Sequence, residues 1–321
     1  MTKTMCLFTL LASVLICSLP AAPALAQRDR VFVASYGSDS NPCTFGSPCK
    51  TFQDAVNVVA AGGEVTAIDS AGFGSISISK SVTITSPNGV EAGIAPPAPG
   101  SAAITITAAS TDVIDLSGLT LDGDGVSNTV GIVMQGGGTL NIQNSVIRNF
   151  GAAGVGFQPD TPATGANPML SVIDTAISNA VIGIDIGPVG TANSSVAIDR
   201  VRILNCNTYG LLVQPQINGS TSTVTVDVSN SVIENDALGV QNQGVEGWMQ
   251  PVMIRSSQIA NNTVTGIAVN GSAATVWLTR STVAENGTAW VTNSGTLLSF
   301  NDNNIIGNIN GNPSPSTTAY K

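Results

Sequence analysis

Apolar residues recur in a short phrase that repeats along most of the chain. It reads apolar, any residue, apolar, two spacers, Ser or Thr, any residue, apolar, any residue, Asn, and a clear copy is Leu140, Ile142, Ser145, Ile147 and Asn149. Apolar residues two positions apart lie on one face of a β-strand, whereas a helix needs a spacing of three or four. In five copies a Gly four or five residues after the Asn opens a third apolar stretch, at Gly154, Gly183, Gly210, Gly239 and Gly266. Each repeat therefore predicts three short β-strands.

The repeats begin at residues 114, 140, 170, 196, 226, 252, 276 and 298, so they are 22 to 30 residues apart. This period leaves no room for a helix and is typical of a solenoid of β-strands. A single coil cannot bury enough apolar surface to fold alone, so it needs neighbours stacked about 4.8 Å above and below it. The pattern predicts one all-β solenoid domain.

The Asn that ends the phrase marks a corner between strands. A tight corner needs a residue that accepts left-handed backbone angles, and Asn and Gly do so most readily. Two outlying copies carry Gly in this slot, Gly123 and Gly307. Stacked asparagine amides can also hydrogen-bond along a fibre-like axis. We therefore expect one column made by Asn149, Asn179, Asn205, Asn235 and Asn261.

Residues 1–26 have the pattern of a secretory signal peptide. Lys3 precedes an apolar run from Leu7 to Leu19, and Ala24-Leu25-Ala26 precedes a cleavage site ahead of Gln27. A transmembrane anchor is the alternative, but the run is short for a bilayer. We expect an exported protein without a transmembrane segment, which is secreted, periplasmic or held at the cell surface.

Charge excludes one class of partner. Cleavage would remove Lys3 and leave ten basic residues against twenty acidic ones. An acidic, lysine-poor chain repels phosphate backbones, so no nucleic-acid partner is expected. It would also repel polyanionic sugars unless a cation intervened.

The cysteines fit an exported chain. Cys43 and Cys49 bracket the tight turn Thr-Phe-Gly-Ser-Pro, and in an exported protein this spacing predicts a disulfide. Metal binding is the alternative, but two thiols in a chain without histidine make a poor zinc site. Cys206 follows a corner Asn and is expected to remain a free, half-buried thiol.

The start of the mature chain resembles a known family. A strand at Val31, a Gly-Ser-Asp-Ser-Asn-Pro turn at 37–42 and the stretch Pro48-Cys-Lys-Thr-Phe-Gln-Asp-Ala-Val56 are similar to the opening of the pectate-lyase-like right-handed parallel β-helix proteins. The resemblance implies a single-stranded right-handed parallel β-helix with a short N-terminal capping helix. It does not imply one activity, because this fold hosts lyases, hydrolases, adhesins and phage fibres.

The expected organisation follows from these features. Thr51 and Asp54 form a capping box for a helix over Phe52–Ala61, ended by Gly62-Gly63, which would cover the open end of the solenoid. We expect a signal peptide at 1–26 and an N-terminal strand, disulfide turn and capping helix at 27–63. The β-helix would follow at 64–311 and a flexible tail at 312–321.

Candidate catalytic residues are few. The chain has no His, which excludes Ser-His-Asp triads. It also excludes the Gly-His-Gly motif of the polygalacturonase-type hydrolases, which share the fold that the resemblance implies. The lyases of that family use an Arg or Lys base beside calcium-holding carboxylates. Aligned repeats place Asp174 beside Arg200, with Asp199 and Arg202 close by. These four are the catalytic candidates, and an exposed ion pair is the alternative.

We expect no required cofactor, and calcium is the one ion for which the chain offers a candidate site. Asp122, Asp124 and Asn128 lie in a Gly-rich turn whose oxygens could converge on a cation. The stretch lacks the third carboxylate and the distal Glu of a full calcium loop, so a plain turn is the alternative.

Three tryptophans are candidate binding residues. Trp248 is on a loop, and we expect Trp277 and Trp290 on outward positions of one late coil, near Met253. Exposed Trp can stack on a sugar ring or bury in a partner protein. Coverage by the chain's own tail is the alternative.

The loops between the third strand of one coil and the first strand of the next vary in length, so they should stack along one variable edge. We expect a non-catalytic exported protein that binds a polysaccharide, a surface glycan or a protein partner along this loop-rich edge. One alternative is a calcium-dependent polysaccharide lyase or another carbohydrate-active enzyme. Another is a structural component of a surface or envelope.

Overall fold

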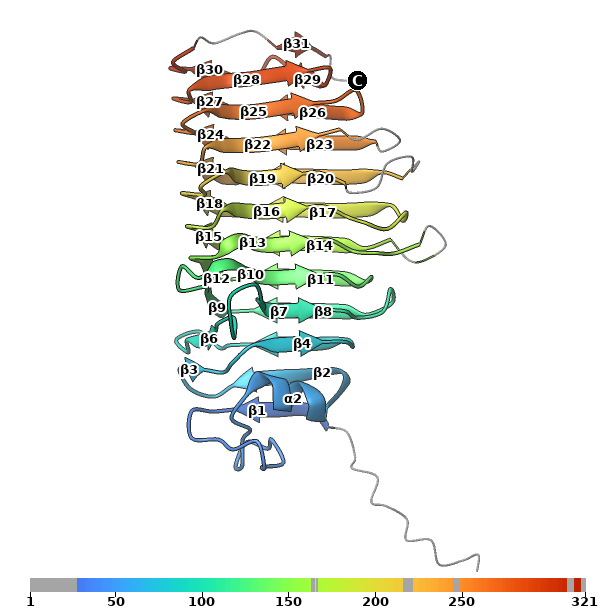
Figure 1. Cartoon of the computed structure of the whole chain (residues 1–321), viewed down its shortest axis with the longest axis vertical. Coiled ribbons are helices and arrows are strands. Elements are labelled where there is room, and N and C mark those ends of the chain that lie inside the picture. The colour runs from blue at the N-terminus through green and yellow to red at the C-terminus, as the bar shows by residue number, and fades with distance from the viewer. Residues whose placement is uncertain are drawn as a thin grey trace, which may run out of the picture.

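Three parallel β-sheets wrap around one apolar shaft in the computed structural model (Figure 1). The structure describes residues 28–162, 165, 167–215, 222–244, 249–310 and 315–318. Each regular coil contributes one strand to each sheet, and neighbouring strands in a sheet are parallel. The fold is the right-handed parallel β-helix that the sequence predicts.

The three sheets are named by the order in which a coil visits them. The first sheet has twelve strands: β1 (Arg28–Val33), β2 (Val59–Ala67), β5 (Val82–Thr85), β8 (Val113–Ser117), β11 (Thr139–Gln143), β14 (Met169–Ile173), β17 (Ser194–Asp199), β20 (Val224–Ser229), β23 (Gln250–Arg255), β26 (Ala274–Thr279), β29 (Thr296–Ser299) and β31 (Ser316–Thr317). The second sheet has ten: β3 (Ala71–Gly72), β6 (Ala92–Ile94), β9 (Leu119–Asp122), β12 (Val146–Arg148), β15 (Ala176–Ser178), β18 (Arg202–Leu204), β21 (Val232–Glu234), β24 (Gln258–Ala260), β27 (Thr282–Ala284) and β30 (Asn304–Ile306). The third sheet has nine: β4 (Ile76–Ile78), β7 (Ala102–Ile106), β10 (Ser127–Met134), β13 (Gly151–Phe157), β16 (Ile182–Ile186), β19 (Tyr209–Val213), β22 (Leu238–Gln243), β25 (Thr265–Asn270) and β28 (Thr288–Asn293).

Inward apolar side chains lie in register from coil to coil. Leu140 of β11 pairs with Ile114 of β8 and Leu170 of β14, and all three are buried. Outward positions between them remain polar or partly exposed, as the alternating pattern predicts. The aliphatic columns therefore fill the shaft, and the outer sheet faces are free to carry a site.

The predicted corner column is confirmed. Asn149, Asn179, Asn205, Asn235 and Asn261 all have left-handed φ angles, between 55° and 62°, and Gly307 continues the column at 71°. The prediction for Gly123 is wrong, because the left-handed residue there is the next one, Asp124. Gly123 is required for a different reason: a Cβ on it would lie 2.5 Å from the carbonyl oxygen of Asn149.

A second left-handed column, which the sequence did not reveal, turns the chain between the first and second sheets. Its φ angles are 47° to 53°, at Asn144, Asp174, Arg200, Asn230, Ser256 and Arg280. Arg and Ser are uncommon with positive φ, so residue type gave little signal at three of the six positions. This corner holds two of the four catalytic candidates.

The Ser or Thr residues of successive phrases lie in a column, and the hydrogen bonds of their buried hydroxyl groups explain why this position is polar. Ser231 Oγ accepts the Val201 N–H at 3.1 Å and donates to the Ser229 carbonyl at 2.7 Å. The Ser231 N–H in turn donates to Ser257 Oγ at 3.1 Å. Each hydroxyl thus satisfies backbone groups at the first corner.

Ser231→Ala is expected to destabilise the protein by about 1–3 kcal/mol, because it leaves the buried Val201 N–H without an acceptor. Chemical unfolding of both proteins measures this difference. Val201→Thr is the matched control, since it adds a hydroxyl to the coil that lacks one and should leave stability equal or higher. A Ser231→Ala protein within about 0.5 kcal/mol of wild type would contradict this role.

The helix α2 (Phe52–Val58) covers the N-terminal end, as predicted (Figure 1). Thr51 Oγ1 accepts the Asp54 N–H at 3.2 Å, which confirms the capping residue. The predicted end at Ala61 is wrong: β2 starts directly at Val59 and pairs with β1. Strand pairing in the first sheet thus prevails over the Gly62-Gly63 stop signal.

Both ends of the chain lie largely outside the described residues. The predicted signal peptide at 1–26 is one such segment and stays a prediction. Of the predicted tail at 312–321, only 315–318 is described, and there β31 pairs with β29. The stretch 87–100 is rich in Pro, Gly and Ala, yet it contains β6 and so adds a strand to the second sheet. In the described part of the chain no helix is long and apolar enough to cross a membrane.

Candidate functional site

The outer face of the first sheet carries a charged depression over β17, β20, β23 and β26. Its volume is about 510 Å³. Carboxylates and guanidinium groups of successive coils line it together with small polar side chains. The lining residues are Ala197, Ile198, Asp199, Asp227, Ser229, Asn230, Arg255, Ser256 and Arg280.

Ion pairs between neighbouring coils organise this face. Arg200 binds Asp174 through two hydrogen bonds, Nε to Oδ1 at 2.7 Å and Nη2 to Oδ2 at 3.0 Å. It also contacts the carboxylate of Asp199. One coil further, Arg255 Nη2 lies 2.9 Å from Asp227 Oδ2. Asp174, Asp199 and Arg200 are therefore together, as the aligned repeats predict.

Arg202 is not part of this cluster. It lies on β18 in the second sheet, in register with Ala176 and Val232, and makes no ion pair with any described residue. The first corner turns the chain between Arg200 and Arg202, so two residues close in sequence belong to different sheet faces.

The ionisation of the cluster does not favour proton transfer. The hydrogen bonds from Arg200 lower the pKa of Asp174, and those from Asn230 and Ser229 lower the pKa of Asp199. The hydrogen bond with Asp174 in turn raises the pKa of Arg200. General acid–base chemistry needs a group with a pKa near the working pH. Together with Asp227, Arg255 and Arg280, these residues instead form an array of three negative and three positive charges.

The calcium candidate is engaged by protein groups. Asp122 Oδ2 accepts a hydrogen bond from Arg148 Nε at 2.7 Å, and Oδ1 accepts one from Asn149 Nδ2 at 2.9 Å. The Asp124 N–H also donates to Asp122 Oδ1, at 3.0 Å. Asp124 and Asn128 have left-handed φ angles, as turn residues do. A cation would have to displace Arg148, so calcium at this turn stays a prediction.

A second, apolar depression of about 400 Å³ lies on the same sheet, on the side of the loop edge. Trp277 lies on an outward position of β26, paired with Met253 of β23, as predicted. Met249, at the end of the preceding loop, is 63% exposed. The lining residues are Thr223, Met249, Gln250, Pro251, Ser272, Ala273, Thr275 and Trp277.

Residues of β23 join the two depressions. Pro251 lines the apolar one and Arg255 the charged one, and Met253 lies between them on the same outer face. Four residues along a strand span about 13 Å. Together the two depressions form a surface we call the tryptophan–arginine face, long enough for an extended ligand.

The other two tryptophans do not join this face. Trp290 was expected to point outward, but it pairs with the inward Ile267 and packs against the core. Third-sheet strands do not alternate between buried and exposed residues: in β25 all five residues from Thr265 to Val269 are buried. Simple alternation therefore does not give the inward register in this sheet. Trp248 lies outside the described residues.

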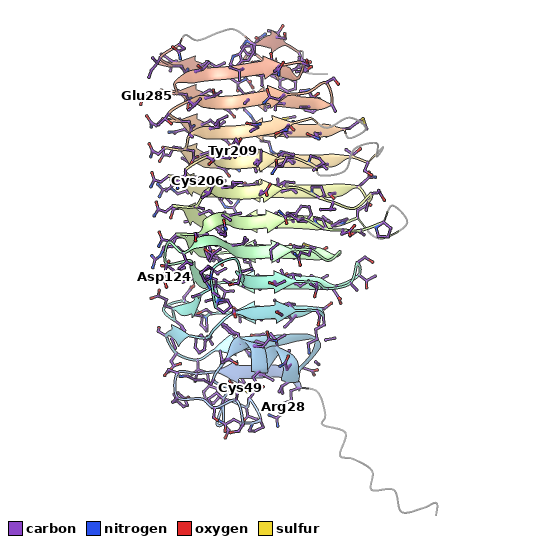
Figure 2. All side chains as sticks on the ribbon, in the orientation of Figure 1. Arg28, Cys49, Asp124, Cys206, Tyr209 and Glu285 are labelled. Atoms are coloured by element: carbon purple, nitrogen blue, oxygen red, sulfur yellow. A yellow bond between two sulfur atoms is a disulfide. The ribbon has the colours of Figure 1, made fainter. Side chains whose placement is uncertain are left out.

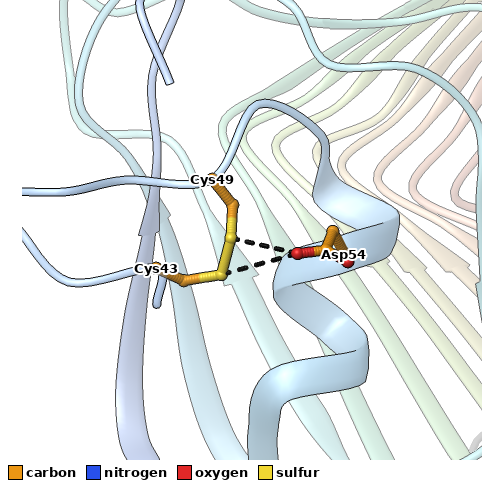
Figure 3. Close-up of side chains that lie close together, drawn as sticks. All are labelled: Cys43, Cys49 and Asp54. Carbon is orange, nitrogen blue, oxygen red and sulfur yellow. Dashed lines mark hydrogen bonds between the residues drawn. A yellow bond between two sulfur atoms is a disulfide. The ribbon is translucent and has the colours of Figure 1, made fainter. Parts of the chain in front are cut away.

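The predicted disulfide joins Cys43 and Cys49, with Cα atoms 4.6 Å apart (Figure 3). Asp54 Oδ2 lies 3.2 Å from Cys49 Sγ, and burial followed by the nearby Asp39 raises the pKa of this carboxyl. Among the described residues this is the one group of three side chains with metal-ligand spacing. Both sulfurs are in the disulfide, so no thiolate is available to bind a metal.

Sequence reasoning missed half of the tryptophan–arginine face. The sequence did not single out Asp227, Arg255 or Arg280, although Arg280 occupies the same first-corner position as Arg200 three coils earlier. The available signal was the register: Asp227 and Met253 occupy the same outward position on successive coils. The described parts of the loops lie along one edge of the solenoid, as predicted (Figure 1), and loop residues hydrogen-bond along it, for instance Val189 N–H to the Pro159 carbonyl at 3.0 Å.

Comparisons with known proteins bear on the fold. No protein-family model matches the chain. No curated protein sequence matches it either. The crystal structure of pectate lyase Pel9A is similar with a TM-score of 0.56 and 13% identity, over 92% of this chain and 78% of that one. The enzymatically active domain of tailspike protein 2 of bacteriophage CBA120 is similar with a TM-score of 0.55 and 14% identity, over 91% of this chain and 45% of that one. This likeness shows that the chain has the right-handed parallel β-helix fold of the pectate-lyase-like proteins.

Proposed function

We propose that this protein is an exported, non-catalytic β-helix protein that binds a polysaccharide or surface glycan on the tryptophan–arginine face. One observation carries the proposal: Trp277 lines an apolar depression on the outer face of the first sheet, and the same face carries a row of hydrogen-bonding charged groups. A sugar ring offers an apolar face and a rim of hydroxyl groups. An aromatic ring beside fixed polar groups is complementary to both.

The charges of the face favour a neutral glycan over a polyanionic one. On the face, Asp199 and Asp227 are balanced by Arg255 and Arg280, and beside it Arg200 pairs with Asp174. The whole chain carries a net charge of −9. A polyanion would gain nothing from the balanced face and would be repelled by the rest. Pectate lyase Pel9A and the CBA120 tailspike share the fold and are named as enzymes. That likeness supports a glycan ligand, whereas the ionisation of the cluster supports binding without cleavage.

Trp277→Ala is expected to weaken glycan binding about tenfold or more, because it removes the stacking surface. Native gel electrophoresis in gels with and without neutral polysaccharides, such as β-glucan, xylan or mannan, measures this as lost retardation. Polygalacturonate with and without calcium forms a separate arm, in which we expect no retardation of wild type.

The matched control is Tyr36→Ala, which removes an aromatic ring that is 67% exposed at the opposite end of the solenoid. This variant should be retarded like wild type. Equal retardation of the Trp277→Ala and wild-type proteins, or no retardation by any neutral polysaccharide, would overturn the proposal.

A further inference from the structure

The residue after the second corner points into the shaft and forms a column of polar side chains in the C-terminal half. All are nearly inaccessible to solvent, at most 6% exposed. We call this column the buried ladder: Cys206, Asp236, Asn262, Asn286 and Asn308. Figure 2 labels Cys206 and Glu285 on the side of the solenoid where this corner stacks.

The amides of the ladder share one hydrogen-bond pattern. Asn286 Oδ1 accepts from the N–H of Asn262 at 3.0 Å and from its Nδ2 at 2.9 Å. Asn286 Nδ2 donates to Asn308 Oδ1 at 2.9 Å and to the Ile259 carbonyl at 3.1 Å. The side-chain oxygen therefore meets donors of the preceding coil, and the side-chain nitrogen meets acceptors.

Asp236 occupies the same rung with a carboxyl in place of the amide. Its Oδ1 accepts the Cys206 N–H at 2.6 Å, and its own N–H donates to Asn262 Oδ1 at 3.0 Å. Its Oδ2 takes the place of the amide nitrogen. A Cβ built on Gly210 would lie 2.5 Å from this Oδ2, just as one on Gly239 would lie 2.7 Å from Asn262 Nδ2.

The surroundings of Oδ2 suit a donor and not an anion. The atom is buried and receives no hydrogen bond. The next rung presents Asn262 Oδ1, an acceptor, which also receives the Asp236 N–H. An ionised Oδ2 would bring negative charge against this acceptor, whereas a protonated one would donate to it.

We propose that Asp236 is a neutral carboxylic acid in the folded protein, that its Oδ2–H completes the buried ladder by donating to Asn262 Oδ1, and that loss of this proton weakens the coil stack. The shaft thus contains a pH-sensitive rung. This inference is independent of glycan binding, because the ladder lies inside the solenoid and the tryptophan–arginine face lies outside.

The ionisable groups around the rung support this state. Burial raises the pKa of Asp236 to about 7. Hydrogen bonding from Cys206 opposes this rise, and the charge of Glu234 on the same coil adds to it. Burial and the adjacent Asp236 raise the pKa of the Cys206 thiol, so the thiol stays neutral. Arg202 and Tyr209 of the preceding coil lie at the outer surface, and residues 258–270 of the following coil contain no ionisable side chain.

The sign of the pH dependence follows from linkage. The folded pKa of Asp236 lies above the unfolded value near 3.8, so the folded protein holds this proton more tightly. The contribution is complete below about pH 4, declines between pH 4 and 7, and is lost above the folded pKa. Across that window the unfolding equilibrium constant of wild type should rise roughly a thousandfold relative to a protein without the group.

Asp236→Asn is the test, because it restores the amide found at the other rungs and should fold. Unfolding equilibria of wild type and variant are compared from pH 4 to pH 9. The ratio of the two unfolding constants should grow about tenfold per pH unit up to about pH 7 and then stay level. A ratio that does not change with pH would overturn the proposal.

Two further measurements keep the test specific. Asp54 and Asp185 also have raised pKa values, but they titrate in both proteins and cancel in the ratio. Glu234→Gln, which removes a nearby carboxylate outside the ladder, should retain most of the slope. At pH 5.5 the infrared spectrum of wild type minus Asp236→Asn should contain a carboxylic-acid C=O band, and a carboxylate band in its place would contradict a protonated Asp236.

Discussion

Phe52→Ala should destabilise the protein by about 3–5 kcal/mol, the largest effect expected of any single truncation here. Phe52 is the first residue of α2 and is fully buried. Its ring packs against Phe73 with ring centroids 4.9 Å apart and a tilt of 53° between the ring planes, where the helix covers the first coils. A cavity at this point loosens the cap and exposes the end of the shaft. Chemical unfolding gives the free-energy difference.

Hydrogen exchange locates the damage from Phe52→Ala. A solenoid is stabilised by contacts between neighbouring coils, so protection should fall first in β1 and β2 and little in β23 to β26. Tyr36→Ala is the control for loss of an exposed aromatic ring and should change stability by no more than about 0.5 kcal/mol. Uniform loss of protection along the whole chain would show that the helix is not a local cap.

Gly239→Ala is expected to cost about 3 kcal/mol. The φ angle is not the reason, since Gly239 is not left-handed. A Cβ would lie 2.7 Å from the Gly266 carbonyl oxygen and 2.8 Å from Ile259 Cγ2, so backbone of the next coil would have to move. The repeated Gly of the phrase is thus required because successive coils approach closely at this point. Thermal unfolding of the variant measures the loss.

Ala289 provides a natural control for this explanation. It lies on β28, at the edge of the third sheet, in the position that Gly266 occupies on β25. No described third-sheet strand stacks beyond it, so a methyl group is accommodated and fully buried there. Ala289→Gly should cost only about 0.5–1 kcal/mol. An equal cost for Gly239→Ala and Ala289→Gly would contradict the close-approach explanation.

The repeat predicted the fold because period and residue type agree. Alternation fixed the strands, and the asparagines at 149, 179, 205, 235 and 261 fixed one corner, where left-handed angles select Asn strongly. The first corner was missed because Arg200, Ser256 and Arg280 carry the same angles without an informative residue type. The end of α2 was missed because pairing of β2 with β1, a non-local contact, stops the helix before its glycines.

The site was only partly predictable for a related reason. Alignment of equivalent corner positions found Asp174 and Arg200, because neighbouring coils place them side by side. It wrongly added Arg202, which the turn carries onto another sheet. Finding Asp227 and Arg255 requires knowing which outward residues of β20, β23 and β26 lie side by side. This strand register depends on the path of the loops between coils, which the sequence alone does not give. Trp290 was misplaced because third-sheet strands do not alternate simply.

The central claim is that the tryptophan–arginine face binds a glycan without cleaving it. The most direct test incubates the protein with each neutral polysaccharide and measures, in one sample, the bound fraction and the reducing ends and unsaturated products released. We predict retention that depends on Trp277 with no products above background. Product formation that is lost in Arg200→Ala, or the absence of retention on every polysaccharide, would contradict it.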